Sequence, residues 1–227
     1  FQNFNKIFRL LYVNSDTVLS IKAEHNDNVR LINKQNFEIY KSMLRPENNI
    51  LRLSCDSIIT KENIPIIISP GDCAVIAVAG IDKNDNKRFI ILIHSGFTGA
   101  ILDIINKTIN IAKAFYKFNN SNLSAFVFPY IAGKNYLKGH EDTRVALVKS
   151  NLEWHRFLTK LKNGVGVDFG KKLESDLTKA GISFQTSSID TFTANSKNLL
   201  FSQTYLRQHN LDESKRFAVG VCLDNYS

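Results

Sequence analysis

The sequence has few cysteines, few histidines and no long apolar segment. Cys55, Cys73 and Cys222 are the three cysteines among 227 residues, too few and too scattered for a disulfide framework. At least one cysteine is therefore available for chemistry. The longest apolar runs, such as residues 64–69 and 89–93, are far shorter than the ~20 residues of a membrane-spanning helix. These absences argue against a disulfide-stabilised scaffold and against a membrane-embedded protein.

A targeting signal is also missing from the start of the sequence. Residues 1–14 mix Lys6 and Arg9 into an apolar stretch, and no small-residue cleavage site follows them. Together with the scarcity of cysteine, this predicts a reducing compartment, the cytoplasm.

The positive charge lacks the pattern of a nucleic-acid-binding protein. The net charge is +8, but the cations come as pairs at residues 87–88, 171–172 and 215–216 rather than in dense runs or basic helical stripes. We interpret most of them as solvated surface side chains. An anionic small substrate is the next interpretation, and we expect no nucleic-acid partner.

The apolar residues predict a folded core of alternating strands and helices. A hydrophobic content of 44% excludes a mainly disordered chain. Short β-branched runs predict buried strands, at residues 64–69, 73–79, 89–94, 124–131 and 217–223. Helical spacing predicts helices, at residues 30–44, 101–118, 143–162 (with room for a break) and 168–180. Asp168 and Gly181 fit the cap positions of the last helix. The expected fold class is α/β, or mixed α+β, in a single domain over residues 1–227.

One pair of strands brings a cysteine and a histidine together. The polar segment at residues 82–86 predicts a turn that joins strands 73–79 and 89–94 into a hairpin. Cys73 then begins one strand where His94 ends the other, so their side chains become neighbours. A thiolate beside an imidazole suits either a metal site or an activated nucleophile. The alternative is a buried structural cysteine beside a hydrogen-bonded core histidine.

The residues after His94 predict an anion site. His94 ends a strand, where α/β proteins often place their ligands, and a glycine-bracketed turn leads into a helix that we expect to start near Gly99. Free backbone N–H groups at a helix N-terminus bind anions, and the Thr98 hydroxyl can add a further donor.

These motifs resemble those of a known family. The sequences GDC at residues 71–73 and HSGFTG at residues 94–99 resemble the ADC and HAGWRG motifs of the YfiH-type laccase-domain family, also called multicopper polyphenol oxidoreductase-like. The resemblance extends over most of the chain, to His25, Asp27 and Asn33 (H-x-G-D…N), residues 125–139 (GPxIGPxxYEVG), Asp168 (LDL), residues 201–202 (FFS) and Arg216 (TGR).

The resemblance implies a fold and a chemistry. It implies a single α/β domain with a His–Cys–His cluster that binds zinc, or copper in early reports, and it maps Cys73 and His94 onto two of the ligands. The implied activity is that of a purine nucleoside phosphorylase or hydrolase on adenosine or inosine, with the nucleoside and phosphate as its small-molecule partners. The residues then expected to bind phosphate or substrate are Gly96, Thr98, Gly99, Tyr136 and Arg216. A true multicopper site needs many more than the five histidines present.

Two departures put this activity in question. The family's other histidine belongs to a QVHG motif, and residues 43–60, where we expect that motif, contain no histidine. His25 and His140 are the candidates for a third ligand, unless both are surface histidines. The arginine of HAGWRG is Thr98 here, which removes a group that could grip phosphate, and Arg216 or Lys134 is the candidate to replace it. The alternative function is therefore a degenerate, non-catalytic homologue that binds a nucleotide or a protein partner.

Overall fold

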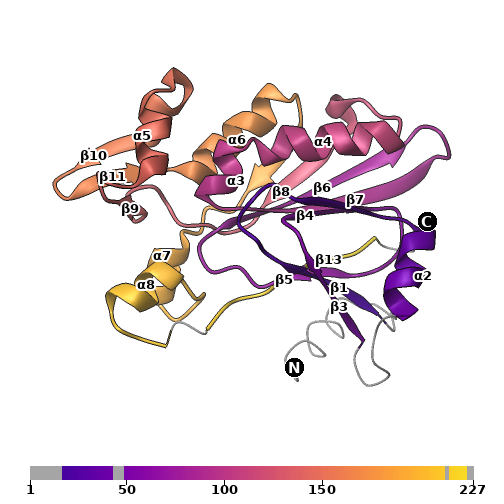
Figure 1. The fold of residues 1–227 in the computed structure, drawn as a ribbon, viewed down its shortest axis with the longest axis horizontal. Coiled ribbons are helices and arrows are strands. Elements are labelled where there is room, and N and C mark those ends of the chain that lie inside the picture. The colour runs from indigo at the N-terminus through magenta and orange to yellow at the C-terminus, as the bar shows by residue number, and fades with distance from the viewer. Residues whose placement is uncertain (1–16, 43–48, 213–214, 224–227) are drawn as a thin grey trace.

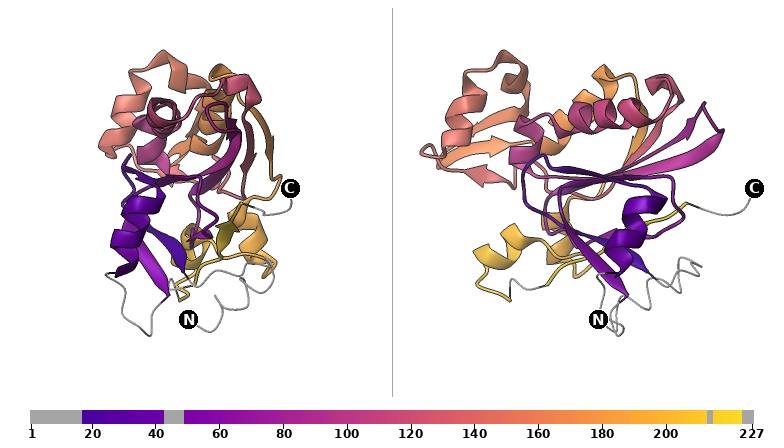
Figure 2. Two further views of the ribbon diagram at one scale, coloured as in Figure 1. Left: turned by 90° about the vertical axis from the view of Figure 1, so that its right-hand side faces the viewer. Right: turned by 45° about the vertical axis from the view of Figure 1, so that its right-hand side comes forward.

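The fold is built in layers around a six-stranded mixed sheet. A computed structural model of the chain describes residues 17–42, 49–212 and 215–223. In Figure 1 helices α3 (Phe97–Ile101), α4 (Ile104–Phe115) and α6 (Phe169–Lys179) lie above this sheet, and a four-stranded sheet lies below it. Figure 2 shows the same layers from two further directions. The mixed α/β class expected from the sequence is confirmed.

The six-stranded sheet contains the predicted hairpin at its centre. Its order is β12 (Ser183–Thr186), β8 (Ser124–Val127), β6 (Ala74–Asp82), β7 (Lys87–Ser95), β4 (Ser57–Thr60) and β2 (Val29–Ile32). Strands β6 and β7 pair antiparallel from Ala74↔Ser95 to Asp82↔Lys87, so the hairpin is confirmed. Because layers cover both faces, both strands are almost continuously apolar rather than alternating.

The four-stranded sheet covers one face of this hairpin. Its order is β13 (Val219–Val221), β5 (Ile66–Ile68), β1 (Val18–Lys22) and β3 (Ile50–Ser54). Between the two sheets Val75 and Leu92 pack with Leu19 and Ile66. On the opposite face of the hairpin, side chains such as Ile76 pack in the core that α3, α4 and α6 share. Two cores therefore meet at β6 and β7 and hold the hairpin from both sides.

Smaller elements surround the end of the hairpin at which Cys73 and His94 lie. A three-stranded antiparallel sheet is formed by β10 (Leu158–Leu161), β11 (Gly164–Val167) and β9 (Leu137–Lys138). It lies with α5 (Thr143–Lys149) at the left of Figure 1, above α7 (Thr191–Ser196) and α8 (Gln203–Gln208). Helix α2 (Lys34–Ser42) lies at the opposite side of the molecule, and the short 3-10 helices η1 (Asn120–Asn122) and η2 (Leu152–Phe157) complete the described elements. Within the described ranges no helix is both long and apolar enough to cross a membrane.

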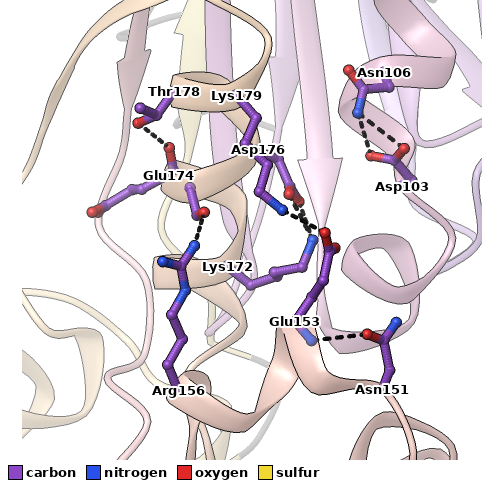
Figure 3. A network of polar contacts seen from close by, with 11 residues as sticks. Asp103, Asn106, Asn151, Glu153, Arg156, Lys172, Glu174, Asp176, Thr178 and Lys179 are labelled. Carbon is purple, nitrogen blue, oxygen red and sulfur yellow. Dashed lines mark hydrogen bonds and ion pairs between the residues drawn. The ribbon is translucent and has the colours of Figure 1, made fainter.

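Helix α6 is fastened to η2 by charged side chains. Lys172 forms a buried ion pair with Asp176 one turn later, and Lys179 pairs with Glu153 on η2 (Figure 3). The Lys172 ammonium also lies 5.4 Å from the centre of the Trp154 ring, and that ring packs against Phe97 at 5.6 Å between centroids. Trp154 thus connects the charged residues of α6 to Phe97, the first residue of α3.

Two of the predicted helices differ in the structure. Residues 29–32 form β2 rather than the start of a helix, and α2 begins only after Asn33, because Asn33 and Asn36 exchange side-chain-to-backbone hydrogen bonds that cap it. Residues 43–44 of that prediction lie outside the described residues. Residues 143–162 divide into α5, η2 and β10, since Asn151 caps a new helix.

The remaining differences are at element ends. The helix expected over residues 101–118 is α4, and it starts at Ile104 because Asp103 adopts a left-handed conformation (φ 55°) that interrupts α3. The strand predicted over residues 124–131 ends at Val127. The caps of α6 are confirmed: the Asp168 carboxylate accepts from the Lys171 N–H at 3.0 Å, and Gly181 takes a left-handed φ of 70°.

Candidate metal centre

Three side chains from three segments meet where β6 begins and β7 ends. Cys73 directly precedes β6, His94 is the penultimate residue of β7, and His25 lies in the loop between β1 and β2. Their ligand atoms, two imidazole nitrogens and a thiol sulfur, all lie within 4.8 Å of one another. His94 is 3% exposed, Cys73 is half-buried and His25 is exposed. The cluster is therefore closed on the His94 side and open to solvent on the His25 side.

The hairpin register places the cysteine against the histidine. Val75 pairs with His94 and Ala74 with Ser95, so Cys73 reaches the level of Gly96. A Cβ atom on Gly96 would lie 2.9 Å from the Cys73 sulfur, closer than real contacts allow. Gly96 is thus needed for the backbone to pass beside the thiol, and the predicted proximity of Cys73 to His94 is confirmed.

Asp56 holds both histidines in place. Its carboxylate, just before β4, is fully buried and accepts a hydrogen bond from His94 Nδ1 at 3.0 Å. It also accepts from the backbone N–H groups of Glu24, His25 and Asn26 at 3.2, 2.9 and 2.9 Å, which stabilises the loop in which His25 has a left-handed φ of 58°. With Nδ1 of His94 engaged by a carboxylate, Nε2 is left to bind a ligand.

The charges of the cluster favour a metal ligand set. Burial raises the pKa of the Cys73 thiol, but His94 and His25 outweigh burial and lower that pKa to about 6. Burial lowers the pKa of His94, whereas Cys73 and Asp56 together raise it to about 9. Burial likewise opposes ionisation of Asp56, yet His94 and the backbone N–H groups hold its pKa below the ordinary value. Near neutral pH the metal-free cluster therefore holds a Cys73 thiolate beside a protonated His94. A metal would displace that proton, and a thiolate and two imidazoles with one side open then fit a tetrahedral site with a free position.

The Asp72 side chain anchors the segment that carries Cys73. Its carboxylate accepts from the Thr191 hydroxyl at 2.8 Å and from the Thr204 N–H at 2.7 Å. These bonds join the start of β6 to helices α7 and α8, which begin at or beside those threonines. The position of the Cys73 sulfur is therefore fixed by these hydrogen bonds of Asp72 as well as by the hairpin.

Aromatic residues form the wall beside the cluster. Phe97, which is buried, meets Tyr136 edge to face at 6.5 Å between centroids, and Tyr136 meets Phe169 in the same way at 5.1 Å. Burial, and the nearby charge of Cys73, raise the pKa of Tyr136. The Lys138 ammonium lies 4.1 Å from the centre of the Tyr136 ring. Tyr136, predicted as a substrate-binding residue, is thus near the cysteine.

The other predicted residues have different surroundings. The helix expected near Gly99 starts at Phe97 and is only five residues long, too short for a strong anion site of its own. A Cβ on Gly99 would lie 2.7 Å from Ser95 Oγ and 3.3 Å from the Asn26 carbonyl oxygen, so Gly99 lets α3 pack on the His25 loop. Arg216 is exposed and donates to the carbonyl of Lys215, and Lys134 is also exposed.

The structure distinguishes between the two candidate third ligands. His25 joins the cluster, whereas His140 lines a separate surface hollow with Lys149, His155 and Lys160. His25 is therefore the candidate that completes a three-ligand group, although residues 43–60 contain no QVHG histidine. His25 is exposed, as a surface histidine is, but it lies within the cluster.

Sequence reasoning missed two further residues. Asp56 has a recognisable signal, since it is a lone carboxylate at the start of an apolar strand and must find partners when buried. The second is Arg144 of α5, whose Nη1 donates to the Thr98 hydroxyl at 3.4 Å. No local pattern points to this contact, because it joins residues of separate elements.

Comparisons with known proteins identify the family of the chain. The model of the family described as multi-copper polyphenol oxidoreductase laccase matches residues 1–223. None of the curated proteins compared with the sequence matches it.

Solved structures share the fold at low sequence identity. The hypothetical protein YfiH of Bacillus licheniformis is similar with a TM-score of 0.78 and 18% identity, over 98% of this chain and 80% of that one. YlmD of Geobacillus stearothermophilus gives 0.76 and 14%, over 97% and 78%. Protein NMB0706 of Neisseria meningitidis, family-model DUF152, gives 0.71 and 14%, over 98% and 80%. The chain therefore belongs to the multi-copper polyphenol oxidoreductase laccase family, the family of the YfiH-type laccase domain.

Proposed function

We propose that the chain is a zinc-dependent enzyme that cleaves purine nucleosides, as a phosphorylase or a hydrolase acting on adenosine or inosine. The observation that carries the proposal is the His25–Cys73–His94 cluster with its buried Asp56 partner. The choice of substrate rests on the resemblance of GDC and HSGFTG to the ADC and HAGWRG motifs.

The open side of the cluster is the reason for proposing zinc rather than copper. Two imidazoles and one thiolate bind either metal, but an open fourth position is typical of a catalytic zinc site. Within the described residues this is the one group of three or more His, Cys, Asp or Glu side chains close enough to hold an ion. A multicopper oxidase requires several such groups, and the described residues do not supply them.

Each residue of the centre has a separate task in this proposal. Bound zinc would supply a Lewis acid that activates an oxygen nucleophile near neutral pH. Cys73 contributes a thiolate, and Asp56 keeps the proton on Nδ1 of His94 so that Nε2 faces the centre. Water or phosphate then attacks C1′ of the ribose, the bond from C1′ to the purine nitrogen breaks, and the purine leaves with a proton. Ribose or ribose 1-phosphate is the other product.

The alternative is a degenerate homologue. That hypothesis rests on the absent QVHG histidine and on Thr98 in place of an arginine. The position of His25 in the cluster supports the enzyme over this alternative.

The test measures metal and turnover on the same protein. Purified protein is analysed for zinc and incubated with adenosine or inosine, with and without phosphate, and products are separated by chromatography. We expect about one zinc per chain and release of free purine, both lost in His25→Ala and Cys73→Ala. His140→Ala is the matched control and should retain both. A folded protein that holds no metal and releases no purine, or one whose Cys73→Ala variant is fully active, would overturn the proposal.

A further inference from the structure

The segment that follows His94 has Thr98 where the family's motif has an arginine, but an arginine from another helix lies beside it. Thr98 lies two residues beyond Gly96, where an added Cβ atom would lie 2.9 Å from the Cys73 sulfur. Arg144, 46 residues further along the chain, places Nη1 at 3.4 Å from the Thr98 hydroxyl oxygen. Its guanidinium carbon lies 5.3 Å from the centre of the Phe97 ring. A guanidinium from α5 therefore lies over the first turn of α3.

The guanidinium is held in a fixed orientation. Nε and Nη2 of Arg144 donate to the two carboxylate oxygens of Asp142 at 3.0 and 2.7 Å. Asp142 is itself fixed as the N-cap of α5, because it accepts from the Arg144 backbone N–H at 3.0 Å. A guanidinium carries five N–H donors, and these partners account for three of them. One donor on Nη1 and one on Nη2 are not used by these contacts and can donate to an oxyanion.

Further positive charge lies near this guanidinium. Lys138 on β9 is half-buried, with its ammonium over the Tyr136 ring. Burial and the charges of Arg144 and Arg207 lower the pKa of Lys138, while Asp142 and Cys73 oppose that shift. Lys138 thus lies among two other cations, Arg144 and Arg207. The Tyr136 ring connects this group to α3, because it contacts Lys138 on one side and the Phe97 ring at 6.5 Å between centroids.

We infer that Arg144, with Thr98 and Lys138, forms an anion subsite beside the His25–Cys73–His94 cluster and binds a phosphate-like group of a reactant. The inference rests on the proposed function for the identity of the reaction, but the subsite is defined by its own residues. In this inference the anion is bound by residues of α5 and β9, and not by Arg216 or Lys134. The anion has two sources of the same chemistry: free inorganic phosphate as co-substrate, or a phosphate carried by the nucleoside.

The test is binding to the zinc-loaded protein, followed by kinetics. Calorimetric titration with inorganic phosphate and, separately, with a purine nucleoside 5′-monophosphate distinguishes the two sources. Arg144→Met keeps the length of the side chain and removes its charge. We expect it to weaken binding of the anion by about 10- to 100-fold, because charge-assisted hydrogen bonds are lost. In phosphorolysis the same variant should raise KM for phosphate by a similar factor and leave KM for the nucleoside nearly unchanged.

Controls separate this inference from the proposed function. Arg156→Met removes an exposed arginine that lies over Phe157, outside the cluster, and should bind the anion as the parent protein does. Zinc content and thermal unfolding verify that Arg144→Met is folded, and Lys138→Met is the second variant if it is not. The parent protein could bind the anion, lose that binding in Arg144→Met, and yet cleave no nucleoside. That result would support the subsite and refute only the proposed function. Anion binding that is equal in parent and variants, or absent from the folded zinc-loaded parent, would overturn the inference.

Discussion

Substitution of Asp56 by asparagine tests the organisation of the metal centre. The carboxylate is fully buried. Oδ1 accepts from His94 Nδ1 and from the N–H groups of Glu24 and His25, while Oδ2 accepts from the N–H of Asn26. Asparagine has the same shape and can keep the Oδ1 partners with its own oxygen. Its NH₂ group would then face the Asn26 N–H, donor against donor.

Two separate losses follow from this geometry. One buried donor without an acceptor costs about 1–3 kcal/mol, so the free energy of unfolding of the metal-free Asp56→Asn protein should fall by that amount. The charge that orients His94 and raises its basicity is also lost. Removing such a partner of a ligating histidine typically weakens metal affinity by about 10- to 100-fold. We expect the zinc dissociation constant to rise within that range.

The assay combines denaturant unfolding of the metal-free protein with zinc titration against a competing chelator. Asp82→Asn is the matched control. Asp82 is equally buried at the other end of β6 and accepts from the backbone N–H groups of Asn84 and Lys117 and from Lys61. The Asp82→Asn protein should be less stable than the parent and should keep the zinc affinity of the parent. Zinc affinity within about twofold of the parent in Asp56→Asn would refute the orienting role, and an equal loss in Asp82→Asn would show a global effect.

Three further predictions follow from the described contacts. Gly96→Ala should abolish stoichiometric zinc binding, measured by metal analysis, because its Cβ would meet the Cys73 sulfur at 2.9 Å; normal zinc content would contradict this. With its pKa near 6, Cys73 of the metal-free protein should be alkylated by iodoacetamide at rates that rise through pH 6. Zinc affinity should fall as the pH drops below about 9, where His94 gains a proton, and more steeply below pH 6, where the thiol is also protonated. Cys55, whose pKa burial raises to about 12, should stay unmodified in mass spectra. Lys172→Met should cost about 3–5 kcal/mol in denaturant unfolding, because it leaves Asp176 charged and buried without its partner, and a loss under 1 kcal/mol would argue against that ion pair.

The hairpin and its two ligands could be predicted because their determinants are local. Strands β6 and β7 are long apolar runs joined by a short polar turn, and the turn alone brings Cys73 to His94. The alternation of strand and helix patterns predicted the mixed α/β class, and the resemblance, whose motifs are spread over most of the chain, implied the same class. The position of α6 followed from its own caps, Asp168 and Gly181.

The third ligand could not be predicted in the same way. His25 lies in an exposed loop after a strand of the other sheet, and its position depends on backbone hydrogen bonds to Asp56, 31 residues away. The resemblance matched His25 to the H-x-G-D segment and expected the third histidine within residues 43–60, so the sequence left His25 and His140 as equal candidates. The same reasoning applies to residues 30–32, where apolar spacing is compatible with a helix until pairing with β4 selects a strand.

A motif that loses a residue need not lose the property that the residue supplied. Thr98 stands where the family's motif has an arginine, yet a guanidinium from α5 contacts that same threonine. Residues 94–99 alone indicate a weakened anion site. In the fold, Arg144 of α5, which is not part of the motif, supplies a positive charge next to Thr98. The third histidine follows the same logic, since a residue absent from the expected segment is supplied by His25. Substitutions in the motifs therefore do not by themselves indicate an inactive chain, because residues from other elements lie beside them. Variants of Cys73, His25 and Arg144, tested together, distinguish an enzyme from a degenerate homologue.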